Sequence, residues 1–317
     1  MSKIIIAGEE VAPSQVKQIQ IPVAKLPTQT MMSLPVTVIN GKEDGARLWL
    51  SAAIHGDEIN GVEIIRRVVS LINPERLKGC IIAVPIVNVF GFIEQSRYLP
   101  DRRDLNRSFP GSESGSLASR LAELFMREVV ANCTHGIDLH TAAIHRVNLP
   151  QIRANLEDEE TRLCAIAFNT PVMIHATTRD GSLRQAASKK GIPILLYEGG
   201  EALRFDGKAI DTGVRGILRV MNYLKMYNIY NHDLEKKSIM VHKSKWIRAS
   251  SSGIYLLETE LGAEVRKKQV LGKITDPFGN KSVAIKAPFS GIVIGHVQNP
   301  LVNQGDAIIH LASAEET

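Results

Sequence analysis

Short apolar runs alternate with segments of helical periodicity over most of the chain. Apolar runs bounded by glycine, proline or polar clusters predict buried strands, and apolar residues three and four positions apart predict amphipathic helices. Strands are expected near residues 18–21, 34–39, 48–54, 79–89, 136–140, 172–175 and 192–197. Helices are expected near residues 60–72, 117–130, 158–168, 183–189 and 213–226. This alternation predicts a three-layer α/β/α arrangement around a mixed, mostly parallel sheet.

The pattern changes after about residue 240, where the helical periodicity stops and an internal repeat begins. Residues 252–256 resemble residues 290–294, and residues 265–274 resemble residues 302–311 with an offset of one position. Two such copies predict a small β-sandwich that resembles the biotinyl/lipoyl carrier fold.

Two domains are therefore expected, a catalytic domain over residues 1–240 and a C-terminal β domain over residues 241–317. A carrier domain needs a modified lysine at the tip of the hairpin that joins its halves. Here the tip is expected at residues 276–279, and Lys281 lies two residues beyond it. We therefore favour a structural or substrate-gating role for this domain over a carrier role.

Three residues of types that commonly bind metal ions lie at or just after the ends of predicted strands. His55 follows an apolar run, Glu58 comes three residues later, and His140 ends another apolar run. Because ligands of such sheets bind at the carboxyl ends of strands, these side chains are expected to converge. Two histidines with one glutamate form a common catalytic zinc set, so one zinc ion per chain is predicted. Asp138, on the same face of its strand as His140, is expected to orient that imidazole.

Glu63 is given a different role from Glu58. It lies three residues after Asn60, which is the spacing of a helix capping box. We predict that Glu63 caps the helix that begins there, which leaves Glu58 as the free carboxylate.

A carboxylate base is expected beside the zinc ion, where it takes the proton of the attacking water and delivers it to the leaving amine. Glu198 ends the strand predicted over 192–197 and precedes two glycines, which allow close approach of a substrate. Glu201, three residues further on, is the alternative base. Glu198 is preferred because the strand fixes its position.

The segment 91–116 is irregular and rich in Arg, Asp, Pro, Gly and Ser, and a loop of this length inside a compact domain is usually functional. Within it, Asn106 and Arg107 place an amide beside a guanidinium, a pair that suits a substrate carboxylate. Another arginine is expected to polarise the scissile carbonyl. Arg97 is the first candidate for this role and Arg103 is the second.

Composition narrows the choice of partners. The 317 residues are 44% hydrophobic and 22% charged, which is ordinary for a soluble globular enzyme. The net charge of +5 is scattered apart from the arginines of the loop, so we expect a small anionic substrate and no nucleic acid. The short apolar part of the N-terminal segment, and the lack of a long apolar run, predict a cytoplasmic protein without a membrane segment.

The cysteines and the remaining histidines are expected to have no special role. The three cysteines lie in apolar surroundings without metal-binding spacing, which predicts reduced core residues. Seven of the nine histidines, all except His55 and His140, are expected to be ordinary core or surface residues.

Taken together, the motifs resemble those of the succinylglutamate desuccinylase/aspartoacylase family, which belongs to the zinc carboxypeptidase clan. They are His-Gly-x-Glu at 55–58, Asp-Leu-Asn-Arg at 104–107, Asp-x-His at 138–140 and Glu-Gly at 198–199, in this order. The resemblance spans about residues 45–205.

The resemblance implies that zinc is held by three residues, that a fourth is the base, and that three more contact the substrate. The metal ligands are His55, Glu58 and His140, the base is Glu198, Asn106 and Arg107 bind a substrate carboxylate, and Arg97 contacts the scissile carbonyl. A zinc-dependent hydrolase that cleaves the amide bond of a small anionic N-acylated amino acid is therefore expected, and it could form a homo-oligomer. Three alternatives are carboxypeptidase-type hydrolysis of a small peptide, deacylation of a substituted diamino acid, and a catalytically inactive ligand-binding protein of the same fold.

Overall fold

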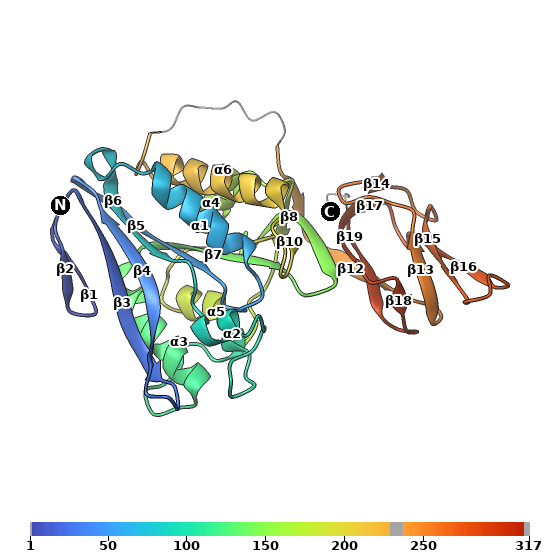
Figure 1. Ribbon diagram of the computed structural model, residues 1–317. Helices are drawn as coiled ribbons and strands as arrows, with labels where there is room; N and C mark the ends of the chain where they lie inside the picture. Colours follow the sequence, from blue (N-terminus) through green and yellow to red (C-terminus); the bar gives the residue numbers. More distant parts are fainter. Residues whose placement is uncertain (1, 229–236, 314–317) are drawn as a thin grey trace.

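A mixed sheet of 13 strands runs through the computed structural model, which describes residues 2–228 and 237–313 (Figure 1). Its strands are β3 (Gln15–Lys25), β4 (Met31–Asn40), β5 (Glu43–Ala52), β6 (Lys78–Val84), β7 (His135–Ala142), β8 (Arg146–Ala154), β9 (Val172–His175), β10 (Ile194–Glu201), β11 (Ile239–Val241), β12 (Ser244–Arg248), β14 (Glu264–Val265), β17 (Gly291–Val297) and β19 (Ala307–Ser313). The order along the sheet is β12-β19-β17-β8-β10-β7-β5-β6-β4-β3, while β9 joins β8 to β11 and β14 pairs with β17. Two smaller sheets consist of β1 (Ile4–Ile6) with β2 (Glu9–Val11), and of β16 (Ser282–Lys286), β15 (Val270–Thr275), β13 (Gly253–Leu257) and β18 (Leu301–Val302).

The four central strands β10, β7, β5 and β6 are parallel neighbours, so their carboxyl ends meet at one edge. Among the described strands from β3 to β11, five of the eight pairings are parallel. The prediction of a mixed, mostly parallel sheet is therefore confirmed for this part of the chain. Beyond β8 the sheet continues through antiparallel strands.

Helices cover both faces of the central strands and complete three layers (Figure 1). They are α1 (Asn60–Leu71), α2 (Val89–Ile93), α3 (Leu117–Glu128), α4 (Glu159–Phe168), α5 (Leu183–Ser188) and α6 (Gly207–Tyr223), with short 3-10 helices η1 (Pro74–Arg76), η2 (Leu105–Arg107) and η3 (Val130–Asn132). One buried cluster joins the sheet to α1, α4 and α6, and another joins the opposite face to α3 and α5.

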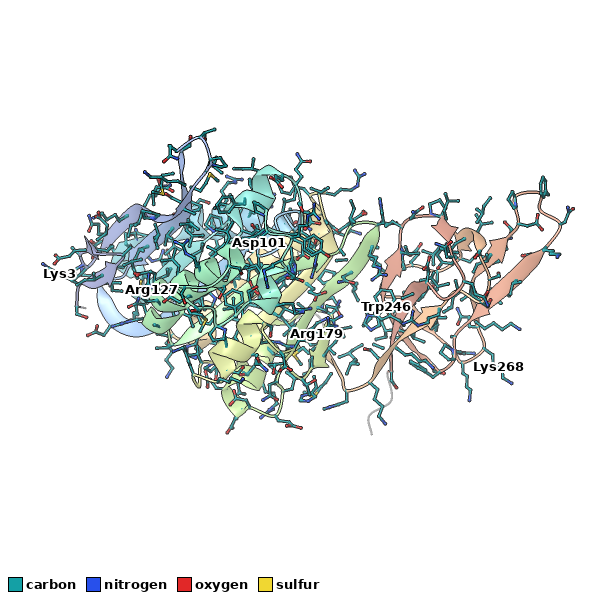
Figure 2. All side chains as sticks on the ribbon, turned by 90° about the horizontal axis from the view of Figure 1, so that it is seen from below. Lys3, Asp101, Arg127, Arg179, Trp246 and Lys268 are labelled. Atoms are coloured by element: carbon teal, nitrogen blue, oxygen red, sulfur yellow. The ribbon has the colours of Figure 1, made fainter. Side chains whose placement is uncertain are left out.

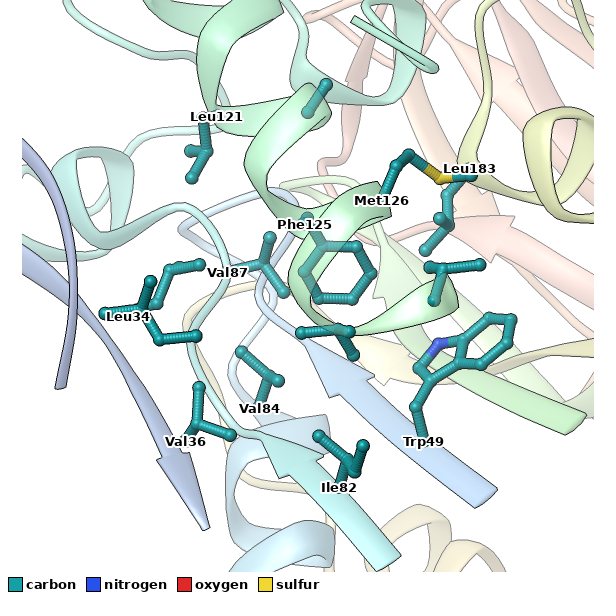
Figure 3. Close-up of a cluster of buried hydrophobic side chains, with 14 of the residues drawn as sticks. Leu34, Val36, Trp49, Ile82, Val84, Val87, Leu121, Phe125, Met126 and Leu183 are labelled. Carbon is teal, nitrogen blue, oxygen red and sulfur yellow. The ribbon is translucent and has the colours of Figure 1, made fainter. Parts of the chain in front are cut away.

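Trp49 of β5 is the largest side chain in the core beneath α3, and it is fully buried (Figure 3). Phe125 of α3 and Leu183 of α5 lie in the same cluster. The neighbouring strand β7 carries Gly136 beside the indole, where a Cβ atom would lie 2.1 Å from the ring. A glycine at this position therefore makes room for the tryptophan.

Helix α6 begins at Gly207, six residues before the predicted start, because Asp206 caps it by accepting a hydrogen bond from the amide of Ala209. Gly213, where the helix was predicted to start, lies inside it. A Cβ atom there would lie 2.5 Å from the Ile64 side chain, so this glycine permits close packing of α6 on α1.

Strand β8 was not predicted, although it pairs with β10, β17 and β9. It contains Pro150, which cannot donate a backbone hydrogen bond. The proline lies where β8 changes neighbours, because residues up to Asn148 pair with β17 and residues from Gln151 pair with β9. The strand therefore accommodates a residue that argues against a strand in the sequence.

The internal repeat of the C-terminal region is confirmed as a structural repeat. Strands β13, β14 and β15 of the first copy correspond to β17, β18 and β19 of the second. The short strand of each copy pairs with a strand of the other copy, because β14 pairs with β17 and β18 pairs with β13. The strands enclose a hydrophobic cluster of their own, which includes Tyr255, Leu271 and Ile309.

The sheet is continuous between the α/β part and the C-terminal strands. Gly295 of β17 pairs with Asn148 of β8 in antiparallel register. Across the same junction, the guanidinium of Arg146 lies 5.2 Å from the ring centre of Trp246, which Figure 2 places between the two parts. Residue 240, where the sequence places the domain boundary, lies inside β11.

Candidate metal centre and active site

His55, Glu58 and His140 converge at the carboxyl edge of the sheet. His55 follows β5 and His140 lies near the end of the neighbouring parallel strand β7. The Nδ1 atoms of His55 and His140 each lie 2.7 Å from a different oxygen of the Glu58 carboxylate. All three side chains are buried, and one ligand atom from each lies within 4.8 Å of the others. The structure thus brings together the three predicted ligands, which we call the catalytic cluster.

Each imidazole of the catalytic cluster is oriented by a second carboxylate. The Nε2 atom of His140 lies 2.8 Å from Asp138 Oδ2, and Asp138 in turn accepts a hydrogen bond from Ser51 Oγ. The Nε2 atom of His55 lies 3.2 Å from Asp104 Oδ1. A proton on each Nε2 satisfies these carboxylates and leaves both Nδ1 lone pairs directed at Glu58, the arrangement that a metal ion requires.

The electrostatics of the catalytic cluster favour positive charge around Glu58. Burial alone would lower the pKa of both histidines. The Glu58 and Asp104 carboxylates nevertheless raise the pKa of His55 above its ordinary value. The Asp138 and Glu58 carboxylates do the same for His140. Burial alone would raise the pKa of Glu58, yet the two imidazoles hold it far below its usual range. A divalent cation would replace the two imidazolium protons without changing the total charge. Two nitrogen donors and one carboxylate therefore fit a catalytic zinc ion.

Glu63 does not cap helix α1, so that prediction was wrong. The helix has Ile59 at its N-cap and no side-chain cap, while Glu63 accepts hydrogen bonds of 2.7 Å from Arg66 and Arg67. Arginines three and four residues further along lie on the same helix face, where they bind the carboxylate in place of the backbone amide at the start of the helix. Glu58 is nevertheless free of the helix, as predicted.

Arg97 lies against the catalytic cluster, whereas Arg103 does not. The Arg97 guanidinium is 3.3 Å from Glu58 Oε1 and 3.0 Å from Asp104 Oδ2. The Arg103 side chain is 63% exposed and its nearest carboxylate, Asp101, is 3.9 Å away. Of the two candidates, Arg97 is the one that lies at the cluster.

Asp104 is a residue that the sequence analysis quoted in a motif without assigning it a role. Its carboxylate contacts His55 and Arg97 and also accepts a hydrogen bond from the backbone amide of Asn106. The signal was present, because an aspartate two residues before Asn106 is an N-cap residue of η2. Burial would raise its pKa, but His55 and Arg97 lower it below the ordinary value.

Asn106 and Arg107 lie on η2, next to this contact. The Asn106 side-chain oxygen accepts a hydrogen bond of 3.0 Å from the Leu183 amide, so its NH₂ group stays available as a donor. The Arg107 side chain is exposed and its guanidinium donates to the Asn106 carbonyl. Gly181 has a φ of +72° and packs on Arg107, where a Cβ atom would lie 2.5 Å from the carbonyl oxygen. The two predicted carboxylate-binding groups are thus held on a fixed turn.

Glu198 lies beside His140, because the two residues are direct partners in the parallel pair β10–β7. Paired positions on adjacent strands point to the same face, so Glu198 faces the side that carries the catalytic cluster. Its Oε2 accepts a hydrogen bond of 2.6 Å from Asn148, and its Oε1 is 3.5 Å from Arg153 Nε. Glu201, the alternative base, instead accepts a hydrogen bond from the His145 amide beyond a bulge in β10.

Two further arginines, Arg153 and Arg184, add positive charge near Glu198, and Arg179 lies close enough to Arg184 to affect its pKa. None of the three was predicted. Burial and the neighbouring Arg153 and Arg179 lower the pKa of Arg184 to about 10. The Arg184 guanidinium donates to the carbonyls of Ala176 and Thr177. Arg153 could not be assigned to the site because the strand that carries it, β8, was not predicted.

None of the described helices is long and apolar enough to cross a membrane.

Comparisons with known proteins identify the family to which the chain belongs. The model of the succinylglutamate desuccinylase/aspartoacylase catalytic domain matches residues 44–224, which is more than half of the chain. An N-alpha-acetyl-L-2,4-diaminobutyric acid deacetylase from Halomonas elongata is 26% identical over 300 residues, covering 90% of this chain and 86% of that protein. A succinylglutamate desuccinylase from Pseudomonas aeruginosa is 34% identical over 122 residues, 35% of each chain.

Solved structures show the same fold. The product-bound ectoine utilization protein EutE (DoeB) from Ruegeria pomeroyi superposes with a TM-score of 0.83 at 22% identity, covering 95% of this chain and 97% of that one. A succinylglutamate desuccinylase/aspartoacylase from Rhodobacter sphaeroides also gives a TM-score of 0.83, at 23% identity and with 96% of each chain covered. The resemblance found in the motifs is therefore confirmed, and the chain belongs to the succinylglutamate desuccinylase/aspartoacylase family.

Proposed function

We propose that this protein is a zinc-dependent hydrolase that removes the acyl group from a small N-acylated amino acid. The observation that carries the proposal is the convergence of His55 Nδ1, His140 Nδ1 and Glu58, with each Nε2 held by a carboxylate. His55, Glu58 and His140 would hold one zinc ion per chain. Family membership supports hydrolysis of an amide bond between an acyl group and an amino acid.

When bound, zinc supplies a Lewis acid that polarises the amide carbonyl and lowers the pKa of a water toward about 7. Glu198 accepts the proton of the attacking water and returns it to the leaving amine. Arg97, held by Glu58 and Asp104, directs its guanidinium to the oxygen on which negative charge develops. Asn148 keeps the Glu198 carboxylate in place.

The substrate carboxylate is recognised by Asn106 and Arg107. The exposed Arg107 guanidinium has no carboxylate partner within residues 2–228 and 237–313, and Asn106 offers a free NH₂ group beside it. An arginine fork binds a carboxylate through two parallel hydrogen bonds, with the amide as a further donor. Arg153, Arg179 and Arg184 add positive charge and favour an anionic substrate.

Among possible substrates we give first place to Nα-acetylated diamino acids, because the Halomonas elongata relative that matches most of the chain is named as a deacetylase of such a compound. Other N-acetyl and N-succinyl amino acids come next. Hydrolysis of small peptides and ligand binding without catalysis are the rival functions.

The test is release of free amine by zinc-loaded protein from N-acetyl-2,4-diaminobutyrate, other N-acetyl and N-succinyl amino acids, and dipeptides. Acylated amino acids should be turned over and dipeptides should not. The matched control is the carboxamide of the preferred substrate, which should react about tenfold to a hundredfold more slowly because it lacks the charged partner of Arg107. In Arg107→Ala this difference should disappear.

Two outcomes would contradict the proposal. Turnover of dipeptides alone would assign the protein to the carboxypeptidase type. Zinc-loaded protein that hydrolyses nothing, while Glu198→Gln binds acylated amino acids as tightly as wild type, would assign it to ligand binding.

We also propose that residues 1–240 form the catalytic domain and that residues 241–317 form a β-sandwich domain of the biotinyl/lipoyl type. The C-terminal repeat and its separate hydrophobic cluster support this division.

A further inference from the structure

A second group of metal-binding side chains lies at the other end of strand β7. The strand begins at His135 and carries His140 five residues later, so their backbone positions lie about 16 Å apart and their side chains point to opposite faces. His135 faces helix α4, where Glu160 and Cys164 lie four residues apart on one face. Their ligand atoms all lie within 4.8 Å of one another. We call His135, Glu160 and Cys164 the α4 cluster.

The spacing of the α4 cluster matches tetrahedral coordination. His135 Nε2 is 3.3 Å and Cys164 Sγ is 3.7 Å from Glu160 Oε1. Zinc bonds are ~2.0–2.2 Å to nitrogen and oxygen and ~2.3 Å to sulfur. At tetrahedral angles, these bond lengths place the N and O ligand atoms about 3.4 Å apart and the S and O ligand atoms about 3.6 Å apart. Two of the three ligand separations therefore match those of a tetrahedral site, and the third, between the imidazole and the thiol, is within 4.8 Å.

The hydrogen bonds of Thr134 fix which nitrogen of His135 is available. The Thr134 hydroxyl oxygen accepts a hydrogen bond from the Arg47 amide, and the hydroxyl donates its proton to the Arg47 carbonyl. The same hydroxyl lies 2.8 Å from His135 Nδ1. Nε2 is therefore the nitrogen that remains for a metal ion, and it faces the Glu160 carboxylate.

We propose that His135, Glu160 and Cys164 bind a second divalent metal ion that accepts thiolate, such as zinc, and that this ion fastens α4 to the start of β7. Cys164 is buried, and Tyr223 holds the second oxygen of Glu160 by a hydrogen bond of 3.2 Å. The Glu160 side chain is 42% exposed, so the fourth position of the ion opens to water. Cys164 binds as thiolate and its proton passes to solvent. With one thiolate, one carboxylate and one neutral imidazole, the divalent ion leaves the site uncharged.

The α4 cluster differs from the catalytic cluster in one ligand type, and this difference makes the proposal testable without an activity assay. The catalytic cluster offers nitrogen and oxygen ligands, whereas the α4 cluster adds sulfur. Cobalt(II) bound to a thiolate shows a sulfur-to-metal charge-transfer absorption in the near ultraviolet, which histidine and carboxylate ligands do not give. Titration of the chelator-treated full chain with cobalt(II) therefore reports on the α4 cluster separately.

We expect wild type to bind two cobalt ions per chain and to develop the thiolate absorption. Cys164→Ser should lose this absorption and one cobalt ion, while Cys80→Ser, which changes a buried thiol outside the cluster, should keep both. Glu160→Gln replaces a half-exposed carboxylate by an amide of the same size, and it should weaken binding at this site about tenfold or more. His55→Ala should lose the other cobalt ion and keep the thiolate absorption.

Absence of the thiolate absorption in wild type at saturating cobalt would overturn the proposal and would indicate that a proton occupies the α4 cluster. Persistence of the absorption in Cys164→Ser would overturn it as well. Neither result bears on the proposed hydrolase function, since the catalytic cluster shares no ligand with the α4 cluster.

Discussion

The Glu198 carboxylate accepts a hydrogen bond of 2.6 Å from the side-chain amide of Asn148. Asn148 lies on β8 between Gly200 of β10 and Gly295 of β17, so it is fixed from both sides. The proposed base is therefore positioned by a residue outside its own strand.

Substitution Asn148→Ala should lower kcat about tenfold to a hundredfold, because a hydrogen bond to a charged group contributes about 1.5–3 kcal/mol. KM should change little, since Asn148 contacts the base and not the substrate. Steady-state kinetics with the preferred substrate measure both values. A rise in KM at unchanged kcat would instead place Asn148 among the substrate-binding residues.

Glu198→Gln should retain the metal ion and lose about 10²–10⁴-fold in kcat, because an amide cannot accept the proton of the attacking water. Glu201→Gln is the matched control, since it makes the same change three residues away on β10. Metal content by elemental analysis and kcat should be measured for both variants. If Glu198→Gln keeps its turnover while Glu201→Gln loses it, the base is Glu201.

Arg97→Ala should lower kcat/KM by about 10²–10³-fold through loss of charge stabilisation at the carbonyl oxygen. Arg103→Ala, which removes an exposed guanidinium from the same loop, should have wild-type kinetics. Because Arg97 also contacts Glu58, the zinc content of Arg97→Ala must be measured beside its activity. A stronger effect of Arg103→Ala would reverse the assignment of the two arginines.

Removal of the metal should make stability depend on pH near neutrality. The pKa values of His55 and His140 are raised, so the stability that they contribute is complete below the ordinary histidine value of about 6.5 and is lost as the pH rises through the raised values. The lowered pKa values of Glu58 and Asp104 contribute stability that is lost only at strongly acidic pH. Chelator-treated protein should therefore melt at a lower temperature as the pH rises above about 6.5.

Zinc-loaded protein should lack this decline, because metal binding keeps both histidines neutral. The measurement is Tm from about pH 5 to about pH 9, with and without chelator. Equal slopes in the two series would show that the two histidines do not take up protons when the metal is removed.

The catalytic cluster could be predicted from sequence because its residues follow apolar runs whose type is unambiguous. His55 follows β5 and His140 lies near the end of β7, two strands that are buried on both faces, and parallel neighbours necessarily bring their ends together. Glu198 was placed at this edge for the same reason, since it follows the apolar run predicted over 192–197, although β10 itself continues to Glu201.

What could not be predicted depends on contacts between distant segments. Strand β8 contains Pro150 and buried polar residues such as Gln151, so its pattern does not indicate a strand. Because β8 was not predicted, Asn148 and Arg153 could not be placed beside Glu198. Glu63 had the spacing of a capping residue, but Arg66 and Arg67 provide a stronger electrostatic partner than a backbone amide.

Gly295 connects the C-terminal repeat to the position of the Asn148 side chain, which contacts Glu198. A Cβ atom at this position would lie 2.8 Å from the Asn148 side-chain oxygen. One methyl group added there would push against the amide that steadies the base. The described C-terminal strands, which contribute no ligand to the catalytic cluster, thus set how much space the Asn148–Glu198 contact has.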